Sequence, residues 1–346
     1  MAGGPVMKIL VGMSGGVDST YAAYKLIEEG HEVCGGILVM HDYTDLFAAE
    51  ASAAALGIPL YNINCRKQFE DAVVSNFIDE YRHGRTPNPC IVCNSRVKFD
   101  CLLDFALENG FDAIATGHYA KLSKTEGGRY CVSDCADGKK NQTYMLWGLS
   151  QRVLSHLVLP LSEMTKDEVR EKTREKELVS WDRADSQEIC FIPEGDHASF
   201  IESRVGKCEE GEFVDEEGRV LGRHRGIIGY TVGQRKGLGI ALGARAFRSK
   251  IDPETNRITL SFNAGESRDF GVSGVVFSGI EPPTEPTEYD LTVKHRYQSP
   301  RIPARVTFYP DGRAEVRLSA PARSLTSGQS AVFYMGDRLV AGGVID

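Results

Sequence analysis

The stretch Ser14-Gly15-Gly16-Val17-Asp18-Ser19 decides the fold of this chain. It follows residues 8–13, which have the apolar composition of a buried parallel strand, and it precedes residues 20–29, which are predicted to form a helix ending at Gly30. Glycines let a backbone approach a ligand closely, and the N–H groups at a helix N-terminus attract phosphate. The stretch therefore predicts a phosphate-binding loop rather than an ordinary glycine-rich turn.

The spacing and three side chains of this loop indicate which kind of phosphate-binding loop it is. The GxxxxGK[ST] spacing of the Walker loop is absent, and no lysine follows Gly16. Ser14 and Ser19 add hydroxyl donors for a phosphate, whereas Asp18 places an acid where an anion would be repelled. We therefore expect Asp18 to hold a metal ion or to orient a neighbouring group.

Residues 7–120 alternate between short apolar runs and longer helical patterns. Strands are predicted at 8–11, 33–40, 60–64 and 113–116, and helices at 46–56, 69–81 and 99–109. This alternation predicts an α/β fold with a doubly wound parallel sheet. Ligands bind such sheets at the carboxyl ends of the strands, where we expect the Ser14 loop, the end of the 33–40 strand and Gly117 to meet. Residues 149–177 are predicted to be helical.

The pattern changes after residue 205. Short alternating runs are separated there by Gly, Pro, Asp and Asn, as is typical of β domains. We expect three domains, with the nucleotide-binding domain at 1–205, a small β domain at 206–268 and a C-terminal β-barrel domain at 269–346.

Composition and charge exclude several classes of protein. No apolar run of the 346 residues approaches the roughly 20 needed to span a bilayer, and the N-terminus lacks the pattern of a secretory signal. The net charge of −8 argues against unspecific binding of nucleic acid, but not against a local basic patch. Basic residues cluster in two stretches, at 219–250 and at 294–301. The odd count of nine cysteines predicts a reducing, cytoplasmic location and thiols that bind metal or act in catalysis.

Three cysteines stand out from the other six. Cys90 and Cys93 form a C-x-x-C pair, and Cys190 follows the polar run 185–188. A C-x-x-C pair alone fits a zinc knuckle, a redox pair or chance, and a zinc site usually needs a fourth protein ligand. Three thiols suit either a [4Fe–4S] cluster with one open iron or a nucleophile with a thiol that carries a persulfide.

Several motifs together resemble the tRNA 2-thiouridylases, which belong to the ATP pyrophosphatase-loop (PP-loop) group with its adenine nucleotide α-hydrolase type of domain. The similarity extends over nearly the whole chain. Its motifs are the loop at 12–19, Gly84-Arg85-Thr86-Pro87-Asn88-Pro89, Cys93-Asn94, Lys98-Phe99, 115–119, 185–192, 230–239, 328–334 and Gly342-Gly343.

The resemblance implies an ATP-dependent sulfurtransferase acting on tRNA. The C2 oxygen of the wobble uridine (position 34) would be adenylated, and sulfur would then replace it, releasing AMP and pyrophosphate. The cofactors implied are ATP, Mg²⁺ and, in the cluster alternative, [4Fe–4S]. The partners implied are the anticodon arms of the Lys, Glu and Gln tRNAs, together with a cysteine desulfurase or relay protein as sulfur donor.

The resemblance also assigns roles to residues. ATP would be bound by Gly12, Met13, Ser14, Gly15, Gly16, Val17, Asp18, Ser19, Leu38 and Gly117. The catalytic residues would be Cys93, Cys190 and Asp18, with Cys190 carrying the persulfide. The target base and the tRNA would contact Asn88, Pro89, Cys90, Lys140, Asn141, Gln142, Arg296 and Tyr297. A flipped base needs hydrogen-bonding and stacking groups of this kind.

Three departures from the family pattern affect these assignments. Cys90 stands where many members have Asp, so Cys90, Cys93 and Cys190 could ligate an iron–sulfur cluster. Asn141 replaces the usual Asp between Lys140 and Gln142, which makes that base contact less secure. The segment 41–48 is short and lacks the acidic, cysteine-containing insert, so one loop near the site must differ.

Two other functions would share some of these features. An amide-forming ligase with the same loop would need neither Cys93 nor Cys190. An RNA-binding module with a structural zinc would bind metal tightly without consuming ATP, but it leaves the phosphate loop unexplained.

Overall fold

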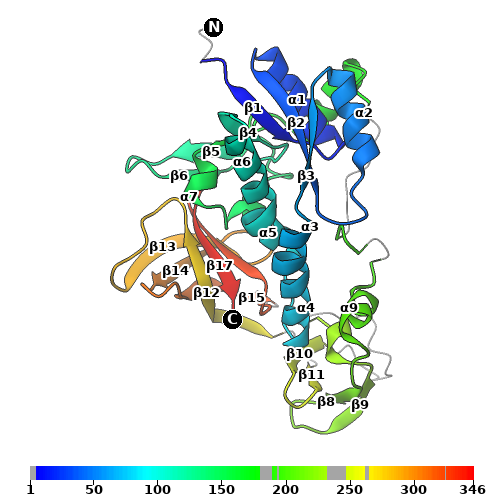
Figure 1. The fold of residues 1–346 in the computed structure, drawn as a ribbon. Helices are drawn as coiled ribbons and strands as arrows, with labels where there is room; N and C mark the ends of the chain where they lie inside the picture. Colours follow the sequence, from blue (N-terminus) through cyan, green and yellow to red (C-terminus); the bar gives the residue numbers. More distant parts are fainter. Residues whose placement is uncertain (1–4, 180–188, 193–194, 232–246, 262–264, 324) are drawn as a thin grey trace.

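Five parallel strands form the first sheet, in the order β3-β2-β1-β4-β7 (Figure 1). The computed structural model describes residues 5–179, 189–192, 195–231, 247–261, 265–323 and 325–346. Within them the strands of this sheet are β1 (Lys8–Gly12), β2 (Glu32–Val39), β3 (Leu60–Asn64), β4 (Ala113–Ala115) and β7 (Leu157–Val158). The predicted doubly wound α/β sheet is confirmed.

Alternate residues of the central strand β1 face two helical layers. Ile9 and Val11 share a buried cluster with residues of α1 (Val17–Glu28) and α2 (Leu46–Leu56), whereas Leu10 packs with residues of α6 (Phe99–Glu108). Both faces of β1 are covered, which explains why its sequence is continuously apolar.

A long, nearly continuous helical segment links the sheet to the rest of the molecule (Figure 1). It corresponds to the helix predicted at 69–81, and it is followed by a second helical segment that bears the C-x-x-C pair. Their parts are α3 (Arg66–Phe69), a π-helical turn (Glu70–Val74), α4 (Ser75–Arg82), α5 (Pro89–Cys93) and a second π-helical turn (Asn94–Lys98) that leads into α6.

Two predicted boundaries are wrong. The first helix begins at Val17 rather than at residue 20, so Asp18 and Ser19 belong to its first turn. The helix predicted over 149–177 is broken into α7 (Gln151–Leu154), β7 and α8 (Lys166–Glu175). The break arises because Leu157 pairs with Ile114 at the edge of the sheet, a contact that local sequence does not encode.

The small β module is a four-stranded sheet in the order β10-β11-β8-β9. Phe213, Ile258 and Leu260 form its fully buried core. The module is preceded by a helix that the sequence analysis did not predict. These elements are α9 (His197–Val205), β8 (Gly211–Val214), β9 (Val220–His224), β10 (Phe247–Asp252) and β11 (Arg257–Ser261).

The C-terminal strands close into a barrel, as expected. Six antiparallel strands follow the order β12-β15-β14-β13-β16-β17, and β17 pairs back with β12. Val306, Phe308 and Phe333 are completely buried in its interior. The strands are β12 (Glu266–Phe277), β13 (Thr287–Lys294), β14 (Ile302–Phe308), β15 (Ala314–Arg323), β16 (Ser330–Met335) and β17 (Arg338–Ile345).

A hairpin from the N-terminal half extends this barrel sheet. It consists of β5 (Lys121–Lys124) and β6 (Tyr130–Ser133), and Ser133 of β6 pairs with Arg338 of β17. The indole of Trp147 donates a hydrogen bond to Ser330 Oγ at 3.0 Å, and Tyr144 Oη donates one to the Ser330 carbonyl. The barrel is thus joined to the nucleotide-binding half by strand pairing and by buried hydrogen bonds. Within the described residues no helix is long and apolar enough to cross a membrane.

Candidate active site

The phosphate loop connects β1 to α1 at the carboxyl edge of the parallel sheet. Gly16 caps α1 with extended backbone, and no side chain caps the exposed N–H groups there. Gly15 has φ +72°, and a Cβ on it would lie 2.5 Å from the carbonyl carbon of Ala48. The Ser14 amide donates to Ser19 Oγ at 3.2 Å, which folds the loop back onto the helix. The resulting amide-lined turn at a helix N-terminus suits a phosphate.

The carboxylate of Asp18 is held by two neighbouring side chains. Both of its carboxylate oxygens accept hydrogen bonds from the Lys166 ammonium at 2.7 Å, and Tyr119 Oη donates to Oδ1 at 2.8 Å. Lys166 comes from the first turn of α8 and is 5% exposed. The lysine neutralises the acid, so that Asp18 does not repel a phosphate bound at the loop.

The other predicted ATP residues lie beside this loop. Gly117 is packed so closely against α1 that a Cβ on it would lie 2.6 Å from the carbonyl carbon of Asp18. Leu38 is buried near the end of β2, and the Met13 amide donates to the Gly36 carbonyl at 2.9 Å. The predicted meeting of the three strand ends at one edge is confirmed.

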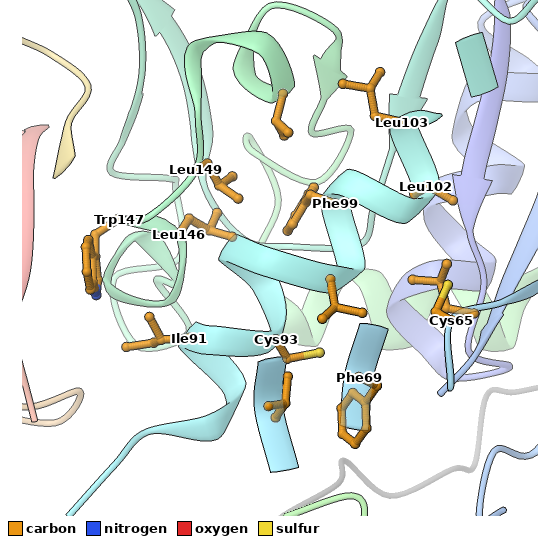
Figure 2. Close-up of a cluster of buried hydrophobic side chains, with 14 of the residues drawn as sticks. Cys65, Phe69, Ile91, Cys93, Phe99, Leu102, Leu103, Leu146, Trp147 and Leu149 are labelled. Carbon is orange, nitrogen blue, oxygen red and sulfur yellow. The ribbon is translucent and has the colours of Figure 1, made fainter. Parts of the chain in front are cut away.

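Cys93 lies among buried apolar side chains at the end of α5 (Figure 2). Its Sγ is 3.6 Å from Sδ of Met40, the residue directly after β2. Burial raises the pKa of the Cys93 thiol, while the nearby Lys98 ammonium opposes this rise. A thiol is therefore anchored to the same edge of the sheet as the phosphate loop.

Cys190 and Cys90 are both exposed and belong to the same neighbourhood. Although solvent reaches Cys190 on one side, protein packed around its other sides raises the pKa of its thiol to about 11, and Cys93 and Cys90 add to this rise. The chain next to Cys190 is anchored by Phe191, whose ring packs edge-on against Phe69 and Phe77 at 5.4 Å each. Residues 185–186 of the neighbouring motif lie outside the described residues.

The iron–sulfur alternative is not supported by the geometry. In the parts of the chain that the structure describes, no group of three or more Cys, His, Asp or Glu side chains could hold a metal ion. Cys90, Cys93 and Cys190 are near enough to influence one another electrostatically, but they do not converge on one point. The three thiols as placed do not fit a cluster.

The residues predicted to contact the target base flank α5 and the barrel. Asn88 caps α5 and its side chain accepts a hydrogen bond from Ile91 N at 3.4 Å, while Pro89 occupies the first helical position. The Asn141 amide group is held by Asp134, and the Gln142 amide oxygen accepts from the Tyr119 amide at 2.8 Å. Both amide side chains are engaged within the protein in the free state.

Arg296 and Tyr297 lie where the barrel meets the nucleotide-binding half. The Tyr297 ring is 6.0 Å from that of Tyr144, and the Lys294 ammonium is 5.4 Å from the Tyr297 ring centroid. Arg296 donates to Thr326 Oγ1 at 2.6 Å. Burial raises the pKa of Tyr297, and the Lys140 cation opposes this rise. The structure thus brings Lys140 and Tyr297 together from segments more than 150 positions apart in the chain.

The basic stretch at 219–250 is mostly a solvated charged face, since the side chains of Arg219, Arg223 and Lys250 are 75%, 65% and 71% exposed. Arg248 is the exception among the described arginines and lysines of this stretch. Arg248 is 1% exposed and its guanidinium lies 4.5 Å from the Tyr230 ring centroid, and Arg219 pairs with Asp215 at 2.6 Å. Arg235, Lys236 and Arg245 lie outside the described residues.

Sequence reasoning missed three residues of the site. Lys166 and Tyr119 hold Asp18. Lys98 lies close enough to Cys93 and Cys190 to oppose the rise in their pKa values, and it adds to the lowering of the pKa of His118. Burial, with a smaller contribution from Lys98, lowers the pKa of His118 to about 3, so this imidazole is neutral. Lys98 and Tyr119 stand inside the quoted motifs, but Lys166 lies in a charge-rich helix that gave no local signal.

The fold and the loop define a nucleotide-binding protein of the PP-loop class. Residues 7–194 match the family model described as tRNA methyl transferase HUP domain. Residues 198–261 match the tRNA methyl transferase PRC-barrel domain, and residues 267–345 match the Aminomethyltransferase beta-barrel domain.

Relatives of known name match the chain over its whole length. The tRNA-specific 2-thiouridylase MnmA of Clostridium acetobutylicum is 42% identical over 360 residues, which cover 98% of this chain and 99% of that protein. The MnmA of Chloroflexus aurantiacus is 43% identical over 356 residues, which cover 97% and 98%. The chain belongs to the tRNA-specific 2-thiouridylase family.

A solved structure shows a weaker similarity. It is a 4-thiouridine synthetase–RNA complex with bound ATP, 21% identical, with a TM-score of 0.35, covering 51% of this chain and 43% of that one.

Proposed function

We propose that this protein is a tRNA 2-thiouridylase that uses ATP to replace the C2 oxygen of the wobble uridine, position 34, by sulfur. Its membership of the family supports this activity. The observation that carries it is the contact between Cys93 and Met40, because it anchors a thiol at the sheet edge that also holds the phosphate loop. A nucleotide site and a sulfur site are therefore within reach of one base.

The first step is adenylation. The uracil C2 oxygen attacks the α-phosphorus of ATP, the bond to the β-phosphate bridging oxygen breaks, and pyrophosphate leaves. The amides and hydroxyls of the loop bind the phosphates, and Leu38 and Gly117 line the adenosine side. Mg²⁺ bound with ATP supplies charge neutralisation for the departing pyrophosphate. The carboxylate of Asp18 is already engaged by Lys166 and Tyr119.

The second step is sulfur transfer. The terminal sulfur of a Cys190 persulfide attacks C2, and AMP leaves with the former C2 oxygen. The Cys93 thiolate then attacks Cys190 Sγ, which releases 2-thiouridine and leaves a Cys93–Cys190 disulfide for an external thiol to reduce. The exposure of Cys190 supports its role as acceptor from a cysteine desulfurase or relay protein. The anticodon arms of the Lys, Glu and Gln tRNAs are the proposed substrates.

We further propose that Asn88, Pro89, Cys90 and the segment 140–142 surround the target base, while Arg296 and Tyr297 contact the anticodon region. Their placement around α5 and at the barrel junction supports this assignment. The domain limits that we propose are 1–205, 206–268 and 269–346.

The experiment is anaerobic incubation with unmodified tRNA, Mg-ATP and a cysteine desulfurase with L-cysteine as the persulfide donor, followed by nucleoside mass spectrometry. As-isolated and iron-reconstituted protein are compared, together with Cys190→Ser and the control Cys208→Ser, a half-buried thiol outside the site. We expect equal 2-thiouridine from both preparations and from the control, and none from Cys190→Ser. Product that depends on iron would reject the persulfide route, and ATP turnover without any thiolated nucleoside would reject the function.

A further inference from the structure

A closed ring of hydrogen bonds joins the phosphate loop to the segment 137–142. The ring begins and ends at the carboxylate of Asp18, and it consists of two arms from different parts of the chain. Lys166 belongs to one arm and Tyr119 to the other. The mechanism above gives no role to Lys166, Asp137 or Tyr119, which connect Asp18 of the phosphate loop to the segment proposed to contact the base.

The first arm runs through Lys166 and Asp137. The Lys166 ammonium donates to both oxygens of Asp18 at 2.7 Å, while its backbone amide donates to Asp137 Oδ2 at 2.9 Å. The other oxygen, Oδ1, accepts from the amides of Lys139 and Lys140 at 2.9 and 3.0 Å. One carboxylate that is 8% exposed therefore ties the start of α8 to the segment before Gln142.

The second arm runs through Tyr119. Its hydroxyl donates to Asp18 Oδ1 at 2.8 Å, and its backbone forms a reciprocal pair with Gln142. The Tyr119 amide donates to Gln142 Oε1 at 2.8 Å, and the Gln142 amide donates to the Tyr119 carbonyl at 2.8 Å. Both ends of the segment 139–142 are thereby tied to the same acid of the phosphate loop.

We propose that Asp137 and Lys166 are positioning residues that hold the base-contacting segment in register with the phosphate loop. The proposal rests on the proposed function, because it takes Lys140 and Gln142 to lie against the target base. Adenylation requires the uracil oxygen within about 3–3.5 Å of the α-phosphorus and in line with the leaving oxygen, and a misplacement of about 1 Å costs up to 100-fold in rate. Two rigid arms from one carboxylate supply this alignment before either substrate binds.

The substitution Asp137→Asn would break the contact to Lys166 while keeping the contacts to Lys139 and Lys140. The amide oxygen of the new side chain can still accept from Lys139 and Lys140, but its NH₂ group faces the Lys166 amide, which is also a donor. Asp137→Asn should therefore keep the turn at 137–140 and detach it from α8. The matched control is Asp215→Asn, since Asp215 is 7% exposed and accepts from the amides of Glu217 and Arg219 in the small β module.

The test is steady-state AMP formation with unmodified tRNA, alongside 2-thiouridine formation and thermal unfolding for each variant. We expect Asp137→Asn to lower kcat about 10- to 100-fold with KM for ATP changed by less than about threefold. Asp215→Asn should keep the wild-type kcat despite a similar fall in melting temperature. The kcat of Asp137→Ala should fall at least as far as the kcat of Asp137→Asn.

Two results would overturn the proposal. One is a kcat of Asp137→Asn that falls only with the folded fraction seen by circular dichroism. The other is a defect confined to KM for ATP. A wild-type protein that forms no 2-thiouridine would instead reject the proposed function, and is thus distinguishable from failure of the ring.

Discussion

At the scale of single residues, two separate constraints require glycine at position 15. Its φ is +72°, and a Cβ would lie 2.5 Å from the carbonyl carbon of Ala48. We expect Gly15→Ala to weaken ATP binding at least tenfold, because the loop must shift away from α2, and to lower the free energy of unfolding by about 1–3 kcal/mol. Calorimetric titration with ATP and urea unfolding measure the two effects.

Gly110 provides the matched control for this prediction. Its φ is +69°, yet nothing lies within 4 Å of the Cβ position. Gly110→Ala should therefore show the cost of the left-handed backbone alone and bind ATP normally. Equal ATP affinity in the two alanine variants would contradict the assignment of Gly15 to the phosphate loop.

The pH dependence of Cys190 follows from its surroundings. Burial and the neighbouring thiols raise its pKa to about 11, so at neutral pH the group of the free protein is mostly the protonated thiol, which reacts slowly. Its alkylation by iodoacetamide should therefore be slow at pH 7 despite its exposure, and should rise about tenfold per pH unit up to pH 10. Peptide mass spectrometry measures the rate, and a rate that levels off near pH 8 would show an ordinary thiol.

At the scale of elements, the start of α8 matters for the site because Lys166 is its first residue. Thr165 caps this helix with a capping box, in which Thr165 Oγ1 accepts from the Glu168 amide and the Glu168 carboxylate accepts from the Thr165 amide at 2.7 Å. Thr165→Ala should lower stability by about 1 kcal/mol and loosen the hold of Lys166 on Asp18. We expect AMP formation to fall severalfold at saturating substrates.

Asp196→Ala is the control for the cap of α8. Asp196 caps α9 by accepting from the amides of Ala198 and Ser199, so its loss should cost a similar amount of stability. AMP formation should then stay at the wild-type rate. If both cap variants reduced the rate alike, general destabilisation rather than the position of Lys166 would be responsible.

At the scale of the whole molecule, the junction between the barrel and the nucleotide-binding half sets where tRNA contacts can act. A Cβ on Gly342 of β17 would lie 2.7 Å from the Trp147 ring, which itself is 7% exposed. Gly342→Ala should force the indole away from Ser330 and shift the barrel. We expect weaker tRNA binding, by about tenfold, with ATP affinity unchanged, measured by filter binding and calorimetry.

Gly127→Ala is the control for Gly342→Ala. Gly127 lies at the tip of the β5–β6 hairpin, and the only atom within 4 Å of its Cβ position is Thr125 Oγ1, at 3.9 Å. The control variant should bind tRNA as the wild type does. Unchanged tRNA affinity in Gly342→Ala would mean that the barrel orientation does not matter for binding.

Local patterns predicted most of the parallel sheet correctly. The strand at 60–64 and the helix at 46–56 have the predicted bounds, because Gly57 ends the helix and Pro59 precedes the strand. The helix predicted over 149–177 is wrong because a non-local contact overrides the local pattern there. Its periodicity is helical, but Leu157 and Val158 are drawn into the sheet by pairing with β4. A short edge strand forms only when it pairs with a neighbouring strand, and its own sequence does not indicate that partner.

The sequence by itself determined the phosphate-loop motif, the three candidate cysteines and the class of protein, because each depends on a few neighbouring residues whose chemistry is local. Only the tertiary structure decided what Asp18 does, since its partner Lys166 lies 148 positions away. It also decided that Cys90, Cys93 and Cys190 are neighbours without forming a metal site in the described residues, and that a hairpin extends the barrel. Such contacts depend on how whole elements pack, and no local period or motif carries that information.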